Sequence, residues 1–157
     1  MVAYRIAKRE YIEDLSGEGA RLHGGRWNRK GTAVVYLAEN RALATVEYLV
    51  HVPLSLLPVD LYIAEISLPA RAEIEEVRSK ALPANWATHP PPAALAEIGE
   101  EWITRNETLV LRVPSAVVQG ECNLLINPKH QHAKQIKIVS SDPMQIDARL
   151  LKSTDSP

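Results

Sequence analysis

The order of strand-like and helix-like segments is the feature of this sequence that most restricts its fold. Short apolar runs rich in β-branched residues, which are typical of strands, occur at residues 33–38, 59–69, 108–114, 122–127 and 135–140. Helical spacing of apolar residues occurs at residues 40–53 and 92–104. Strict strand–helix–strand alternation is missing, because the strands cluster in the middle and at the C-terminal end. This order predicts a single compact α+β domain with a mixed, mostly antiparallel bent sheet and flanking helices.

The first helical segment carries signals for both of its ends. Asn40 is a residue type that caps helix N-termini, and Pro53 is expected to end the helix. The apolar residues that recur at helical spacing between them are Leu43, Val46 and Val50. We therefore expect these three side chains to form the apolar face of the helix.

The remaining segments are less sharply bounded. Residues 83–94 are rich in proline and are expected to form an ordered loop or short turns, followed by a helix over residues 92–104. The side chains expected on one face of that helix are Leu95, Ile98 and Trp102. Residues 59–69 alternate with a slip in phase near Glu65, which predicts a strand that can carry a bulge there.

The composition is that of one soluble globular domain. The chain has 157 residues, of which 46% are hydrophobic and 24% are charged, so it is long enough to bury a substantial core. The sequence contains no internal repeat, low-complexity tract or interdomain linker. We therefore interpret residues 1–151 as one domain and the polar residues 152–157 as a disordered tail.

Charge and cysteine content restrict the partners and the compartment. The net charge of −1 argues against direct DNA binding by this chain. No run approaches the roughly 20 apolar residues of a membrane-spanning helix, and residues 1–11 carry charges where a signal peptide would need an apolar core. Cys122 is the only cysteine, which excludes an intrachain disulfide and makes the reducing cytoplasm the expected location.

Several motifs of common enzyme sites do not occur in the sequence, among them the P-loop, the GxSxG elbow, HExxH and the Rossmann GxGxxG. His130 and His132 form an HxH pair in what reads as a turn, with no carboxylate nearby in sequence. We interpret them as part of a solvated loop and expect no metal site. Cys122 is interpreted as a small strand residue and not as a nucleophile.

The stretch GGRWN at residues 24–28 combines residue types that suit a ligand. Gly24 and Gly25 allow a ligand to approach the backbone closely, and Arg26 offers a planar fork for a phosphate or carboxylate. Trp27 suits core packing better than ring stacking, and Asn28 fits either a turn cap or a contact to a ribose hydroxyl. From local chemistry alone, an ordinary glycine-rich turn is the favoured interpretation.

Three residues later in the chain have ordinary structural roles when each is taken singly. Tyr36 lies in a strand, where tyrosines commonly fill the core. Glu47 lies at the boundary of the apolar helix face, from which its carboxylate could point into a cleft. Ser115 follows a proline at a strand end, where a hydroxyl commonly bonds the local backbone.

Taken together, these residues carry a family resemblance over nearly the whole chain, from Tyr4 to Leu151. The matching stretches are YRIAKREY, GEGARLHGGRWNRKGTAVVYLAENRALATVEYLVH, LPANW, VPSAVV, ECNLLINPKH and DARLL. They occur in the order of the RES-domain family, toxins of Xre–RES toxin–antitoxin modules named for an Arg, a Glu and a Ser, and the sequence resembles that family. The one local departure is IDARLL, where the family more often has a proline before the arginine.

The resemblance implies a site and a reaction. The Arg, Glu and Ser of the family name match Arg26, Glu47 and Ser115, and the family's site tyrosine matches Tyr36. The resemblance implies a fold similar to that of ADP-ribosyltransferase toxins. It also implies an enzyme that destroys NAD at its nicotinamide–ribose bond, with NAD as substrate and no prosthetic group.

The expected roles follow from that chemistry. An oxocarbenium-like ribose needs a nearby carboxylate, for which Glu47 is the candidate. Arg26, with the backbone of Gly24 and Gly25, is the candidate clamp for the pyrophosphate, and Tyr36 could stack on or orient the nicotinamide. Ser115 could bond a phosphate, the ribose or Glu47. The further candidates for NAD binding are Asn28, Asn123 and Arg5.

The acceptor of the ADP-ribosyl group and the partners remain open at this level. Water would give a glycohydrolase, inorganic phosphate a phosphorylase, and a protein side chain an ADP-ribosyltransferase. A noncatalytic binding module is the alternative outside enzymology.

The resemblance also implies a protein partner. This partner is a co-encoded Xre-family helix-turn-helix antitoxin that blocks the cleft around Arg26, in an oligomeric complex.

Overall fold

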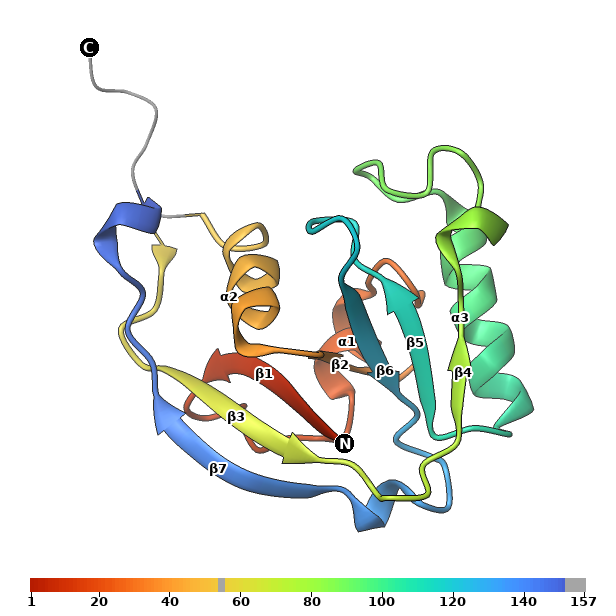
Figure 1. The fold of residues 1–157 in the computed structure, drawn as a ribbon, viewed down its shortest axis with the longest axis horizontal. Coiled ribbons are helices and arrows are strands. Elements are labelled where there is room, and N and C mark those ends of the chain that lie inside the picture. Colours follow the sequence, from red (N-terminus) through yellow and green to blue (C-terminus); the bar gives the residue numbers. More distant parts are fainter. Residues whose placement is uncertain (54–55, 152–157) are drawn as a thin grey trace.

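The computed structural model describes residues 1–53 and 56–151, with one mixed sheet as its framework (Figure 1). The strands are β1 (Val2–Lys8), β2 (Val35–Ala38), β3 (Leu61–Ser67), β4 (Ile74–Glu76), β5 (Val110–Pro114), β6 (Cys122–Ile126) and β7 (Lys137–Pro143). The helices are α1 (Glu18–His23), α2 (Arg41–Leu49) and α3 (Ala93–Arg105), with 3₁₀ turns η2 (Ser79–Ala81), η3 (Ala133–Gln135) and η4 (Ala148–Leu151). The expected tail at residues 152–157 lies outside the described residues.

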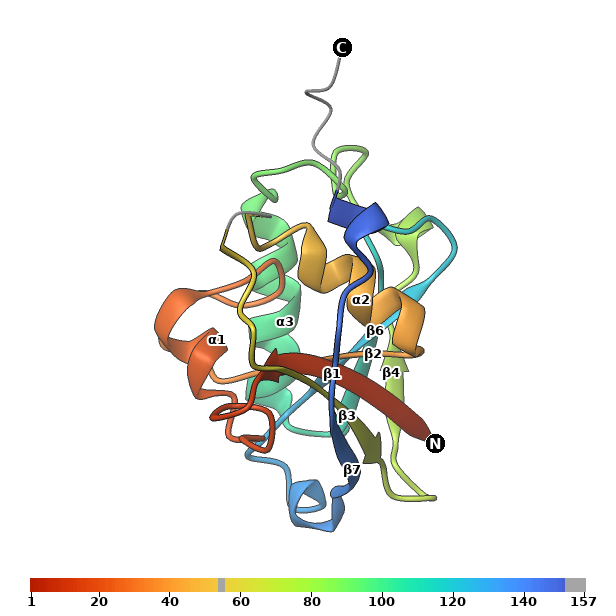
Figure 2. The same ribbon diagram turned by 90° about the vertical axis from the view of Figure 1, so that its left-hand side faces the viewer.

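The strand order is β4-β5-β6-β2-β1-β3-β7, and every neighbouring pair is antiparallel except β4–β5. The sheet bends between β1 and β2, where a single register pair, Tyr4 with Ala38, joins the strands. In Figure 1 the strands β4, β5 and β6 stand upright, whereas β1, β3 and β7 run across them. Figure 2 shows the same bend with β7, β3 and β1 toward the viewer. The predicted fold class is confirmed, including the bend.

Helix α2 begins as expected, but of its predicted apolar face only Leu43 is buried. The Asn40 side chain accepts a hydrogen bond from the backbone N–H of Leu43 at 2.8 Å, and the helix ends before Pro53. The residues that α2 buries are Leu43 and Ala44, while Val46 and Val50 are 38% and 55% exposed. The reason is that α2 rests on the bent sheet through its first turn, so only one edge of the apolar stripe reaches the core.

Helix α3 matches the predicted helix and packs on the β5–β6 half of the sheet. Leu95 and Trp102 are fully buried, and they pack with Leu111, Val113 and Leu125. The opposite face of the same strands packs into a second cluster that includes Val110, Leu124 and Ile126. Both faces of β5 and β6 are therefore covered, which explains why apolar residues occupy the successive positions 109–111 and 124–126.

The irregularity expected near Glu65 is present, but the extra residue belongs to the neighbouring strand. Glu65 pairs with Ser140 and Ile66 pairs with Ile138, so Val139 of β7 has no partner in β3. Across the other edge, β3 pairs with β1 without interruption.

Within the described residues no helix is both long and apolar enough to cross a membrane.

Candidate active site

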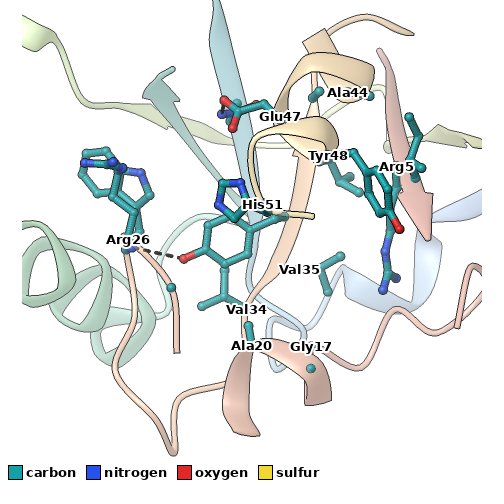
Figure 3. Close-up of a pocket in the computed structure, with 18 of the residues that line it drawn as sticks. Arg5, Gly17, Ala20, Arg26, Val34, Val35, Ala44, Glu47, Tyr48 and His51 are labelled. Carbon is teal, nitrogen blue, oxygen red and sulfur yellow. Dashed lines mark hydrogen bonds between the residues drawn. The ribbon is translucent and has the colours of Figure 1, made fainter. Parts of the chain in front are cut away.

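A cleft of about 420 Å³ opens where the two halves of the sheet meet, a volume in the range of small-molecule sites. Its walls come from β1, β2, α1, α2, the glycine-rich loop before β2 and the loop after β5. Figure 3 shows Glu47 on α2 and His51 just beyond its end, with Arg26 and Arg5 on opposite sides of the view. The bend of the sheet thus creates the cavity, and residues distant in sequence line it.

The Glu47 carboxylate is held in one orientation by two hydrogen bonds to the same oxygen. Its Oε1 accepts from the Ser115 hydroxyl at 2.7 Å and from the Asn123 amide at 2.5 Å. Ser115, buried just after β5, in turn accepts the backbone N–H groups of Val117 and Val118 at 3.1 and 3.0 Å. Among the described residues, no group donates a hydrogen bond to Glu47 Oε2. One oxygen is therefore fixed by the protein and the other is available to a ligand.

The glycine-rich loop is built around the buried amide of Asn28. Its Nδ2 donates to three backbone carbonyls, those of Ala20, Arg29 and Thr32, at 2.9 to 3.1 Å. Its Oδ1 accepts the hydroxyl of Tyr36 at 2.7 Å. Asn28 is 1% exposed and lies behind the cleft wall, so its geometry supports a role in shaping the loop and not a direct contact to a ribose.

Tyr36 lines the cleft with its ring while its hydroxyl is directed into the loop. The hydroxyl donates to Asn28 and accepts the backbone N–H of Trp27 at 3.1 Å. Burial raises the pKa of the Tyr36 phenol well above its ordinary value, so the hydroxyl stays neutral. A Cβ atom at Gly25 would lie 2.7 Å from that hydroxyl oxygen, which explains why a glycine is required there.

Two arginines reach the cleft from its two sides. Arg26 Nη1 donates to the backbone carbonyls of Trp86 at 2.7 Å and Thr88 at 3.1 Å. Arg5 Nη1, from β1, donates to the backbone carbonyl of Asp14. Burial lowers the pKa of both guanidinium groups, opposed by the Glu47 charge for Arg26 and by the Asp14 charge for Arg5. A guanidinium nevertheless remains protonated, so both present positive charge to an anionic ligand.

The structure brings most of the expected site residues to one cavity. The ones that line it are Arg5, Gly24, Gly25, Arg26, Tyr36, Glu47 and Asn123. Ser115 and Asn28 lie one layer behind and hold Glu47 and Tyr36, respectively. The Trp27 side chain is buried in the core with α3, as expected.

The sequence did not point to Ala44 and Tyr48 on α2 or to His51 in the turn after it, and all three line the cleft. The signal that could have found His51 is its short distance in sequence from Glu47, because the turn that ends α2 keeps His51 close to the last turn of that helix.

The two other candidate reactive groups lie away from the cleft. Cys122 begins β6, as expected for a strand residue, and burial raises the pKa of its thiol. The solvated loop expected for the HxH pair is wrong for His130, which is 5% exposed, and its Nδ1 accepts the backbone N–H of His132. The turn after β6 is held by backbone hydrogen bonds, from the N–H of His130 to the Asn127 carbonyl and from the N–H of Ala133 to the His130 carbonyl. The described residues contain no cluster of three or more His, Cys, Asp or Glu side chains that could hold a metal ion.

Comparison with known proteins assigns the chain to a family. The profile of the RES domain matches residues 2–147. The chain belongs to the RES-domain family. Relatives include a protein named Prs ADP-ribosylating toxin from Sphingobium sp. (strain YBL2), which is 40% identical over 142 residues, covering 89% of this chain and 88% of that protein. Toxin Res from Photorhabdus laumondii is 38% identical over 156 residues, covering 98% and 99%.

The fold is also shared with a solved structure. A chain in the crystal structure of the M. tuberculosis MbcT–MbcA toxin–antitoxin complex aligns with a TM-score of 0.76 over 96% of this RES-domain chain and 86% of that chain. Sequence identity is 19%, so the alignment shows a common fold. The single α+β domain with its bent, mostly antiparallel sheet is therefore the fold of at least one other protein solved in a toxin–antitoxin complex.

Proposed function

We propose that this RES-domain protein is the toxin of a toxin–antitoxin system and that it cleaves the nicotinamide–ribose bond of NAD in the cytoplasm. The observation that carries the proposal is the fixed Glu47 carboxylate, which faces the cleft that Arg26 and Tyr36 also line. The cleft is large enough to take a substantial part of a dinucleotide. Family membership and the name Toxin Res support the toxin role, and the name of the Sphingobium relative, an ADP-ribosylating toxin, supports a reaction that uses NAD.

The chemistry requires few groups from the protein. When the bond between ribose C1′ and the nicotinamide nitrogen breaks, its electron pair goes to the positively charged ring, which leaves as neutral nicotinamide. No general acid is needed for that step. The ribose becomes oxocarbenium-like, and the free Glu47 oxygen stabilises this developing charge. A nucleophilic oxygen or nitrogen of the acceptor then forms a bond to C1′, and any proton on that atom passes to the solvent.

The other residues place the substrate. Arg26 and the backbone at Gly24 and Gly25 bind the pyrophosphate, and Arg5 supplies positive charge on the opposite side of the cleft. The Tyr36 hydroxyl is bonded to the loop, so only the ring of Tyr36 is left to contact a ligand. In this proposal the ring faces the nicotinamide. Ser115 and Asn123 act through Glu47, because their hydrogen bonds hold its carboxylate in place.

The test is to incubate the purified protein with NAD and to measure the released nicotinamide by chromatography. Nicotinamide should accumulate with the wild-type chain and not with Glu47→Gln. Parallel reactions with and without inorganic phosphate identify the small-molecule acceptor. Absence of nicotinamide in every reaction, with folded protein, would contradict the proposal.

A second candidate function is transfer of the ADP-ribosyl group to a protein. It is favoured by one observation, the name of the Sphingobium relative, an ADP-ribosylating toxin. The same bond breaks in this reaction, and only the acceptor differs. NAD labelled in its adenine portion, incubated with the protein and a cell lysate, should then leave label on a protein band. Nicotinamide release without labelled protein would favour hydrolysis or phosphorolysis instead.

A neutralising partner belongs to the same proposal. The fold match to a chain from a toxin–antitoxin complex supports an antitoxin, and the resemblance to Xre–RES modules favours a helix-turn-helix protein that blocks the cleft around Arg26. Co-purification with the product of a neighbouring gene, with loss of nicotinamide release, would support this.

The alternative of a noncatalytic binding module makes a different prediction. If expression of the protein arrests cell growth, Arg26→Ala and Glu47→Ala would then leave that arrest unchanged.

A further inference from the structure

The guanidinium of Arg26 is only partly available to a ligand, because a distant segment occupies one of its nitrogens. Both hydrogen bonds from Nη1 go to backbone carbonyls, those of Trp86 and Thr88, in the segment between η2 and α3. No other hydrogen bond or ion pair of this guanidinium is found within residues 1–53 and 56–151. A guanidinium has five N–H groups, so three remain, one on Nε and two on Nη2.

The segment that binds Arg26 is itself held in a defined shape. The backbone N–H of Trp86 donates to the carbonyl of Pro83 at 2.9 Å, and that of Thr88 donates to the carbonyl of Asn85 at 3.0 Å. The Thr88 hydroxyl reinforces the turn, because it donates to the carbonyls of Asn85 at 2.9 Å and Pro90 at 3.3 Å. The Trp86 side chain packs against the core cluster of α3 and β5.

We infer that the turn at residues 85–88 is a positioning element for Arg26, which selects the Nε–Nη2 edge of its guanidinium as the anion-binding edge. That edge presents two parallel N–H groups, the arrangement that binds two oxygens of one phosphate or carboxylate. The inference rests on the proposed function, in which the anion is the pyrophosphate of NAD. Trp86 and Thr88 contribute through Arg26 and need not contact the substrate.

The inference has a physical basis in the length of the arginine side chain. A free arginine has many rotamers, and binding an anion would require it to lose that freedom. Two carbonyls on Nη1 fix the plane of the guanidinium before a ligand arrives. Binding then costs less ordering, and the charge lies at a defined place relative to Glu47.

The experiment replaces Thr88, whose hydroxyl holds the turn and whose side chain is exposed. Thr88→Val removes the hydroxyl at nearly constant volume, and Thr88→Ser retains it. Isothermal titration with ADP-ribose should show a dissociation constant raised about three-fold to ten-fold in Thr88→Val and restored in Thr88→Ser. The KM for NAD should rise similarly while kcat changes less, because pyrophosphate binding is shared by ground and transition states.

The matched control is Thr104→Val on α3. The Thr104 hydroxyl also donates to a backbone carbonyl, that of Glu100 at 2.8 Å, but it lies outside the cleft. This variant should bind ADP-ribose as the wild type does. Thr88→Ala serves as a second removal of the hydroxyl should the valine variant be poorly folded.

A double-mutant cycle separates positioning from general stability. In an Arg26→Gln background, Thr88→Val should have no further effect on ADP-ribose affinity. Binding is weak in this background, so it is measured from NMR chemical-shift changes. Two outcomes would overturn the inference. One is an equal reduction of ADP-ribose affinity by Thr88→Val in both backgrounds, and the other is unchanged affinity in a folded Thr88→Val variant. If the wild type binds neither NAD nor ADP-ribose, the proposed function itself fails, so the two failures are distinguishable.

Discussion

The two oxygens of the Glu47 carboxylate lie in different environments, and this difference predicts the effect of a conservative change. Glutamine retains an oxygen that accepts the Ser115 and Asn123 hydrogen bonds, so Glu47→Gln should fold normally. It replaces the negative charge that would stabilise the ribose cation with a neutral amide. We expect nicotinamide release to fall about 100-fold to 1,000-fold, the usual loss when a charge-stabilising group is removed.

The control for this prediction is Glu101→Gln, an exposed glutamate of α3 outside the cleft. It should retain wild-type turnover. Thermal melting of both variants checks that their folds are intact. Equal turnover in Glu47→Gln and the wild type would remove Glu47 from the reaction.

The buried phenol of Tyr36 predicts how stability depends on pH. Burial raises the pKa of Tyr36 in the folded protein, whereas in the unfolded chain it titrates near its ordinary value of about 10. Below about pH 10 both states are protonated, so the stabilising contribution is fully present. Above that pH the unfolded state ionises and the folded state does not, so the free energy of unfolding should fall as the pH rises.

The comparison variant for this prediction is Tyr36→Phe. It loses the hydrogen bonds to Asn28 and from Trp27, which should lower the free energy of unfolding by about 1–3 kcal/mol near neutral pH. It should also show a shallower decline of stability above pH 10 than the wild type. Urea unfolding across pH 7–11 measures both, and parallel curves for the two proteins would contradict the buried-phenol account.

At the scale of elements, the contact between α3 and the glycine-rich loop depends on one missing side chain. A Cβ atom at Gly99 would lie 1.9 Å from the backbone oxygen of Trp27, so Gly99→Ala must push the helix and the loop apart. We expect the free energy of unfolding to drop by about 1–3 kcal/mol, as for other overpacked sites. ADP-ribose should bind more weakly as well, because Arg26 precedes Trp27 in the displaced loop.

Gly19→Ala is the matched stability control, because a Cβ atom at Gly19 in α1 would have no atom within 4 Å. Alanine there should leave the free energy of unfolding unchanged or raise it by up to about 1 kcal/mol, since glycine is the poorer helix former. Chemical denaturation of the two alanine variants measures the difference. An equal effect of both substitutions would show that close packing at Gly99 is not what stabilises the loop.

Elements with strong local signals could be predicted from the sequence, and those that depend on distant partners could not. Asn40 and the apolar spacing of residues 92–104 predict α2 and α3, because capping and amphipathic periodicity are local properties. Strand β1 was not predicted, since YRIAK mixes charges with apolar residues. It becomes a strand because β3 and β2 flank it. Helix α1 is six residues long and contains a glycine, too short a segment for periodicity to show.

The site divides in the same way. The family resemblance predicts that Arg26, Tyr36, Glu47 and Ser115 belong together, and the structure brings them to and around one cleft. The anchoring of Arg26 was not predictable, because backbone carbonyls accept hydrogen bonds whatever the side chain. The exposure of Val46 and Val50 on α2 has a related cause, because the apolar pattern allows several rotations of the helix and the contact with the bent sheet selects one.

At the scale of the whole molecule, the bend places the cleft across a weak connection in the sheet. One register pair joins β1 to β2, whereas seven join β1 to β3. Arg5 lies on the β1 side of this seam, and Tyr36 and Asn123 lie on the other side. A ligand that contacts both sides therefore links the two halves of the sheet, in addition to its contacts with single residues.

This arrangement predicts that ADP-ribose stabilises the seam. A ligand at 100 times its dissociation constant raises the free energy of unfolding by about 2.7 kcal/mol, provided it binds only the folded state. Amide exchange should slow in both β1 and β2 when ADP-ribose is bound, and ADP-ribose is not consumed because it lacks the nicotinamide–ribose bond. Nicotinamide alone lacks the pyrophosphate, so it should protect β2 and leave β1 unchanged. Protection by ADP-ribose confined to one half would mean that the ligand does not bridge the bend, and Arg5 would then have no part in binding.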